Sequence, residues 1–360
     1  MLGARNHVPN SRCGALGTVE GVRVATASAV ASAVAAGVLL AGCTEAEPEP
    51  LPPSSGPSTT STPPPDASPS STATPSPPPP SSPTAEPRVD PDDVHGATAM
   101  AAVRHLAGTI GARPGASPAY FRAAGWVESK LTELEWTVER QRFRVPAGSS
   151  VAGPTAGLPV EAGPSVNLVA TRGDVVEGEP WLLAGAHLDT VPTSPGAEDN
   201  GSGIGVLLAT AEALAGHRTR LPVVLVAFGS EEPRGPGDDD HHFGSRTYVA
   251  DLSDAQRRSL AGMVALDRVG VGTVVPLGSA AADDPLLAEL EGAAARVDVP
   301  VVTETDQRSS DHWSFVREGL PGVRLGSTSY AGYHSPTDTP DVVDPAQLER
   351  TARILVAWLR

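Results

Sequence analysis

The chain has 360 residues, and its 26 basic and 42 acidic residues give a formal net charge of −16. Such an acidic chain is a poor candidate for binding nucleic acid, because nucleic acids select basic surfaces. Its two cysteines, Cys13 and Cys43, both precede residue 44, so the rest of the chain has no thiol for a cysteine protease or a thiolate zinc site.

The first 43 residues are predicted to be a lipoprotein signal peptide. Arginines precede an apolar stretch at 24–40, and the motif "LAGC" ends at Cys43. A basic start, an apolar segment and small residues make a secretory signal. The final four residues resemble a lipobox of the actinobacterial type, which implies cleavage before Cys43 and lipidation of it. The alternative is a transmembrane anchor, but the alanine-rich run is short for a membrane span.

Residues 44–93 are predicted to be a disordered linker. Proline, serine and threonine dominate the segment, and 17 of the 37 prolines lie between Cys43 and Asp92. Such a composition cannot bury a core and favours an extended, semi-rigid spacer. At about 3 Å per residue, the spacer could carry a domain on the order of 140 Å from a membrane.

Residues 94–360 are long enough for one large domain, and their apolar patterns predict alternating helices and strands. Helices are expected at 98–108, 117–134, 200–216, 283–297, 310–319 and 344–359. Strands are expected at 136–145, 165–173, 180–187, 222–228, 262–270, 300–305 and 321–326. This order predicts an α/β fold, a single three-layer domain with a mostly parallel or mixed central sheet and helices on both faces.

Polar residues gather where several of the predicted strands end. These residues are His187, Asp189, Asp199, Glu231, Glu232, Asp267 and His334. Ligands of open α/β sheets bind beyond the carboxyl ends of the strands. Imidazole and carboxylate groups suit zinc, and their number fits two ions. Zinc would also explain why Glu231 and Glu232 can be adjacent, since cations offset the repulsion between carboxylates.

Several motifs in the second half of the chain resemble peptidase family M28, which includes bacterial aminopeptidases. They are "HLDT", "AEDNGSGIGVLLATAEAL", "FGSEE", "ALDRVG", "SDHWSF" and "GYHSPTDTP". The resemblance implies a zinc exopeptidase-like domain with two Zn²⁺ per chain. The implied ligands are His187, Asp199, Glu232, Asp267 and His334, with Asp199 bridging.

The same resemblance assigns three further residues. Glu231 takes the place of the general base, Asp189 that of the carboxylate that orients His187, and Tyr333 that of a donor to the oxyanion. The M20 peptidases share the order of ligands, but Asp199 follows His187 by only twelve residues, which is much closer than in that family. Only 67 positions separate Asp267 from His334, too few for the domain that M20 enzymes insert there.

The sequence therefore predicts a dizinc aminopeptidase that acts on peptides. Glu231 would take a proton from water and return it to the leaving amine. Alternatives on the same scaffold are another zinc-dependent amide hydrolase, a carboxypeptidase or a glutaminyl-cyclase-like enzyme. A metal-binding surface lipoprotein without activity is a further alternative. We expect a monomer on the outer face of the cell membrane, secreted and anchored only through Cys43.

Two features depart from the M28 pattern. The connection "EPRGPGDDDHHFG", which begins at Glu232, is long. Its Asp238–His242 run is predicted to be a solvated loop, with a third metal site as the alternative. Arg268 stands beside Asp267, where relatives often have an apolar residue. Its charge is expected to face solvent or the rim of the site.

Overall fold

The computed structural model describes residues 86–360 apart from residues 174, 282 and 327. The predicted signal peptide, Cys43 and the linker up to residue 85 lie outside the described residues. Val89 is fully buried, and Arg88 forms a parallel β-bridge with Arg218, so packing on the domain begins several residues before position 94. No helix in the described part of the chain is long and apolar enough to span a membrane.

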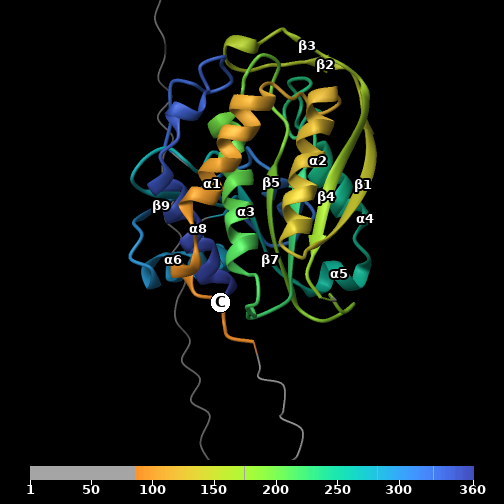
Figure 1. Cartoon of the computed structure of the whole chain (residues 1–360). Helices are drawn as coiled ribbons and strands as arrows, with labels where there is room; N and C mark the ends of the chain where they lie inside the picture. Colours follow the sequence, from red (N-terminus) through yellow and green to blue (C-terminus); the bar gives the residue numbers. More distant parts are fainter. Residues whose placement is uncertain (1–85, 174, 282, 327) are drawn as a thin grey trace, which may run out of the picture. The chain divides into compact units, whose positions relative to one another are not determined.

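An eight-stranded mixed sheet forms the centre of the domain (Figure 1). Its strand order is β1-β4-β6-β5-β7-β10-β8-β9. The strands are β1 (Thr137–Val145), β4 (Gly163–Thr171), β5 (Trp181–His187), β6 (Val223–Phe228), β7 (Leu260–Leu266), β8 (Val275–Gly278), β9 (Val301–Glu304) and β10 (Gly322–Leu325). A separate pair comprises β2 (Gly148–Ser149) and β3 (Pro159–Val160). Strands β6, β5, β7 and β10 run parallel, whereas β4 is antiparallel to β1 and β6, and β8 to β10.

Strand β5 lies between β6 and β7, and all seven of its residues are buried. A strand covered on both faces needs apolar residues at successive positions, which explains the nearly continuous apolar run that predicted it. Strand β1 is different because it lies at the edge of the sheet and alternates exposed with half-buried residues. Its arginines and glutamate discourage edge-to-edge pairing with another chain.

Helices cover both faces of the sheet, as Figure 1 shows. One face carries α1 (Gly96–Val103) with its continuation η2 (Arg104–Ile110), α2 (Pro118–Glu133), α3 (Gly203–Ala213), α6 (Pro285–Arg296) and α8 (Pro345–Leu359). The other carries α4 (Phe243–Asp251), α5 (Asp254–Ser259) and α7 (His312–Val316). Each face has its own buried apolar cluster, so the predicted three-layer α/β fold is confirmed.

Helices α4 and α5 and strand β8 were not predicted. The buried residues of α4 include Gly244 and Ser245 as well as Tyr248 and Val249, so its buried face has no clear apolar pattern. Helix α5 buries no residue, and β8 contains a proline. These elements depend on tertiary packing, which an apolar period does not report.

Gly185, in the middle of β5, lies so close to the Phe228 ring that a side chain at this position would clash with it. A Cβ atom at Gly185 would lie 2.3 Å from Cε2 of Phe228. We therefore expect Gly185→Ala to lower the free energy of unfolding by about 1–3 kcal/mol, measured by chemical denaturation. The control is Gly125→Ala in α2, where a new Cβ would lie 3.9 Å from Nη2 of Arg140 and alanine favours the helix. Equal losses in the two variants would contradict this explanation.

Candidate metal centre

The predicted metal ligands converge at the carboxyl ends of three parallel strands. His187 is the last residue of β5, Glu232 follows β6 and Asp267 follows β7. Asp199 lies in η4 (Ala197–Ser202), an irregular turn before α3 in which Asp199 itself is not helical. His334 lies between β10 and η6 (Pro340–Val342). All five side chains are buried.

The backbone is strained at several turns beside these ligands. Ser230, Arg268 and His334 have φ angles of 53°, 56° and 49°, in the left-handed region that non-glycine residues rarely adopt. Ser230 precedes Glu231, and Arg268 follows Asp267. Such strain persists where surrounding contacts over-determine the backbone, and it clusters at functional sites. The turns therefore mark this end of the sheet as specialised.

Asp199 lies between the two histidines. Its Oδ1 is 3.2 Å from Nε2 of His187, and its Oδ2 is 3.3 Å from Nε2 of His334. Nε2 of His187 is also 3.6 Å from Oδ1 of Asp267, and Nε2 of His334 is 3.0 Å from Oε2 of Glu232. The five residues thus form two pairs, His187 with Asp267 and His334 with Glu232, which share Asp199.

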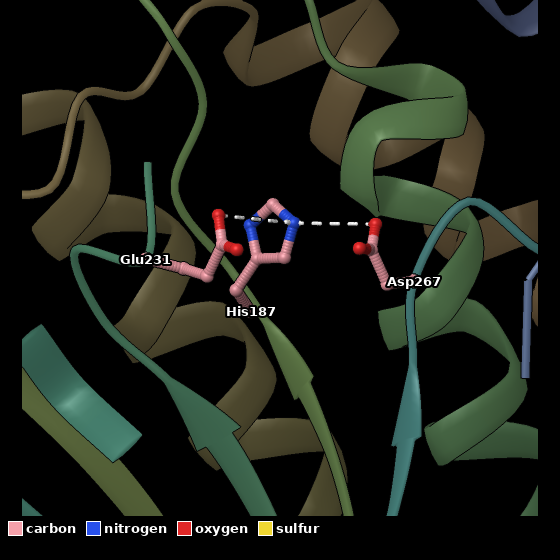
Figure 2. Close-up of side chains that lie close together, drawn as sticks. All are labelled: His187, Glu231 and Asp267. Carbon is pink, nitrogen blue, oxygen red and sulfur yellow. Dashed lines mark ion pairs between the residues drawn. The ribbon is translucent and has the colours of Figure 1, made fainter. Parts of the chain in front are cut away.

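Glu231 lies beside the first pair. Figure 2 shows the His187 ring between the carboxylates of Glu231 and Asp267, with Oε2 of Glu231 at 3.9 Å from Nε2 of His187. Among the residues that the structure describes, two groups have atoms close enough to share an ion, namely His187, Glu231 and Asp267, and His187, Asp199 and Glu232. The position of Glu231 is compatible with either a ligand or a base.

The chemistry of the cluster fits zinc. Oε1 of Glu232 and Oδ1 of Asp267 are buried without a hydrogen-bond partner among the residues that the structure describes. Burial raises the pKa of Glu231 to about 8 and that of Glu232 to about 7, and neighbouring carboxylates act in the same direction. A divalent cation reverses this effect because it favours the ionised form. Imidazole nitrogen and carboxylate oxygen are also established zinc donors.

Asp189 supports the turn that carries both glutamates. Its carboxylate accepts hydrogen bonds from the backbone N–H groups of Glu231, at 2.9 Å, and Glu232, at 3.3 Å. Its Oδ1 lies 3.8 Å from Nδ1 of His187, while its own backbone carbonyl is closer to that nitrogen, at 3.2 Å. In this geometry the carboxylate of Asp189 positions the glutamates more directly than the His187 ring.

Arg268 and Tyr333 meet at the rim. The Tyr333 ring stacks on the His334 ring with centroids 3.9 Å apart, and Cζ of Arg268 lies 4.7 Å from the Tyr333 centroid. Nε of Arg268 is 3.4 Å from Oδ1 of Asp267, and Nε of Arg324 is 3.3 Å from Oδ2. Burial opposes ionisation of Asp267, but Arg324 and Arg268 hold its pKa well below the usual range. Asp267 is therefore kept in the ionised form that a metal ligand requires.

Two residues without an assigned role in the sequence hold the Asp199 turn. Asp338 accepts hydrogen bonds from the backbone N–H groups of Glu198, at 2.8 Å, and Asp199, at 3.0 Å. The Asn200 side chain donates to the Leu266 carbonyl at 2.8 Å and so ties the turn to the end of β7. Asp338 lies within the motif "GYHSPTDTP", but the motif alone did not indicate that this residue supports the Asp199 turn.

Arg113 fixes the segment between His187 and Asp199. Its guanidinium is buried and donates to the carbonyls of Leu188 and Pro195, both at 2.7 Å, and of Gly196 at 3.0 Å. Burial lowers the pKa of Arg113 to about 10, although nearby carboxylates oppose this shift. No sequence pattern pointed to this residue, because the carbonyls of Leu188, Pro195 and Gly196 lie at least 75 positions away.

We expect Arg113→Met to leave buried carbonyls without donors and to lower the free energy of unfolding by about 2–4 kcal/mol. Bound zinc per chain should also fall, because the segment linking His187 to Asp199 is released. Chemical denaturation and elemental analysis measure the two effects. Arg122→Met, at an exposed position of α2, is the control. Matching stability and zinc content in the two variants would exclude this role for Arg113.

The Asp238–His242 prediction was correct only in part. Asp238 and Asp239 are exposed, as a solvated loop requires, but His242 is buried. Its Nε2 lies 3.0 Å from Oε1 of Glu231. Three aspartates precede the two histidines, so in the sequence His242 resembled part of an acidic surface loop. The fold instead buries its ring.

A cavity of about 250 Å³ opens beside the cluster. It is lined by Val151, Arg308, Trp313 and Tyr333, and also by all five predicted ligands and Glu231. Carboxylates and imidazoles thus face a small space that has both apolar and cationic walls.

The chain matches a known protein family and several known proteins. A model of peptidase family M28 matches residues 167–359, more than half of the chain. Leupeptin-inactivating enzyme 1 of Streptomyces exfoliatus is 31% identical over 243 residues, which cover 64% of this chain and 49% of that protein. The probable lipoprotein aminopeptidase LpqL of Mycobacterium tuberculosis is 30% identical over 207 residues, 46% of this chain and 39% of that protein. The chain therefore spans about half or less of the length of these two relatives.

Solved structures share the fold at low identity. BSAP, a zinc aminopeptidase from Bacillus subtilis, aligns with a TM-score of 0.64 and 17% identity over 74% of this chain and 94% of that chain. A glutaminyl cyclase from Porphyromonas gingivalis aligns with a TM-score of 0.63 and 20% identity over 74% of this chain and 98% of that chain. Both likenesses establish the α/β scaffold, and they do not separate the two activities.

Proposed function

The chain belongs to peptidase family M28, and on that premise we propose that it is a dizinc aminopeptidase. The observation that carries the proposal is the position of Asp199, whose two oxygens face the two histidines at 3.2 and 3.3 Å. A single ion would need only one of the two ligand pairs. The presence of both, each completed by a different carboxylate, favours two ions.

The chain's own residues divide the reaction between them. Two Zn²⁺ would be held by His187, Asp199, Glu232, Asp267 and His334, and they would supply Lewis acidity to the peptide carbonyl and to water. Glu231 takes a proton from water and returns it to the leaving amine. Tyr333, on the cavity wall, donates a hydrogen bond to the developing oxyanion.

The size of the cavity favours the end of a peptide as substrate. Its volume of about 250 Å³ is below the range of roughly 300–1,000 Å³ that is common for ligand pockets. A single terminal residue fits such a space better than an extended chain. Trp313 and Val151 offer apolar contacts to its side chain, and the site carboxylates attract its free amine.

The test combines metal analysis with a panel of chromogenic aminoacyl substrates and peptides. We expect two zincs per chain and chelator-sensitive release of an N-terminal residue. Glu231→Gln should keep both zincs and lose at least about 100-fold in kcat, the scale of a general base, whereas Glu232→Gln should lower zinc content. Loss of zinc in Glu231→Gln would make that residue a ligand. Two zincs without hydrolysis of any substrate would favour a metal-binding lipoprotein.

A cyclase is the second candidate, because a glutaminyl cyclase shares the scaffold. The same panel therefore includes peptides with N-terminal glutamine. Release of ammonia with an intact peptide chain reveals cyclisation, whereas release of free glutamine reveals an aminopeptidase.

We also propose that the protein is a lipoprotein on the outer face of the cell membrane. The support is the "LAGC" motif and the name of the mycobacterial relative, a probable lipoprotein aminopeptidase. We expect Cys43→Ser to abolish metabolic labelling by a fatty acid and to move the protein out of the membrane fraction. Undiminished labelling of this variant would exclude Cys43 as the anchor.

A further inference from the structure

The two oxygens of the Glu231 carboxylate face different histidines. Oε1 is 3.0 Å from Nε2 of His242, and Oε2 is 3.9 Å from Nε2 of His187. Both partners of the shorter contact are buried, with side-chain exposures of 7% for His242 and 9% for Glu231. That separation is within the range of an N–H···O contact, in which a proton on Nε2 of His242 would face an ionised carboxylate. His242 thus lies against one oxygen and leaves the other directed at the metal centre.

The backbone holds His242 against Glu231 independently of the side chains. The N–H of His242 donates to the Glu231 carbonyl at 2.9 Å, and the N–H of Phe243 donates to the Ser230 carbonyl at 3.0 Å. His242 has a φ of 56°, in the left-handed region, and directly precedes α4. Its own carbonyl accepts from the N–H of Arg246 at 2.9 Å in the first turn of that helix. The imidazole is thus placed by rigid neighbours, as a group that positions another must be.

The Glu231 carboxylate has to be held in place because it is also close enough to the metal centre to bind an ion as a ligand. Potential ligand atoms of His187, Glu231 and Asp267 lie within 4.8 Å of one another, close enough to hold one ion together. A glutamate side chain has several rotatable bonds, so a free Glu231 carboxylate could turn both oxygens toward a cation. A carboxylate bound in that way would no longer be available as a base.

We propose that His242 is a positioning residue that holds Oε1 of Glu231, so that Oε2 alone faces the metal centre and Glu231 acts as a base instead of a ligand. The proposal rests on the proposed function and adds the residue that decides which role Glu231 takes. His242 belongs to neither candidate ion group among the described residues. It therefore acts as an outer partner, and loss of such a partner typically costs 10- to 100-fold in activity or metal affinity. This role would explain the long connection that begins at Glu232, because that connection carries His242 to Glu231.

The test uses a graded series at position 242 in the purified, zinc-loaded protein. Glutamine places an amide nitrogen near the position of Nε2, asparagine is one methylene shorter, and leucine has no donor. With leucine 4-nitroanilide as the probe, we expect His242→Gln to keep most of kcat. His242→Asn and His242→Leu should lose about 10- to 100-fold in kcat with little change in KM. His217→Leu, at a half-buried histidine that lies 3.8 Å from Asp93, is the matched control with unchanged kinetics.

A crystal structure of zinc-loaded His242→Leu gives a readout that does not depend on turnover. A Glu231 carboxylate that has moved onto the ions supports the proposal, and one that keeps its native orientation overturns it. Wild-type kcat in His242→Leu, or equal losses in the glutamine and leucine variants, also overturns it. If the wild-type protein binds two zincs but releases no N-terminal residue, the proposed function fails, while the crystal structure still decides the role of His242.

Discussion

The burial of a cluster of carboxylates at one end of the sheet is the constraint on which the rest of the site depends. Five of them, Asp189, Asp199, Glu231, Glu232 and Asp267, are each at most 7% exposed as whole residues. Burying one carboxylate is costly unless it is paired, and neighbours of like charge raise the cost. Each of the five therefore has a different set of partners, and those partners set its role.

The partners follow a simple division. Asp189 accepts backbone N–H groups and so belongs to the framework. Asp267 lies against two guanidinium groups, Asp199 between two imidazoles, and Glu232 beside one imidazole. These contacts leave room for cations that the same oxygens can share. Glu231 alone faces an imidazole outside the proposed ligand set, which agrees with a separate task for it.

The sequence predicted the sheet, and the residues that the fold gathers at its end, better than the residues that support them. Strands β5 and β6 are buried on both faces, so composition alone marks them. Among the proposed ligands, His187 ends β5 and Glu232 follows β6, so the strand pattern itself points to them. Arg113 and His242 are different, because their importance comes from contacts with carbonyls and a carboxylate that the folded chain brings to them. A single sequence carries no periodic signal for such contacts, which explains why His242 was mistaken for part of a surface loop.

The place where the described chain enters the domain has a consequence for access to the cavity. Arg88 pairs with Arg218, which lies just ahead of β6 and thus near the amino end of that strand. The cavity lies beyond the carboxyl ends of the same parallel strands, at the opposite pole of the domain. Arg88 and Val89, where the described chain joins the domain, therefore lie on the far side from the mouth of the cavity. The first described residues take no part in lining that mouth, so access to it depends on the loops beyond the carboxyl ends of the strands.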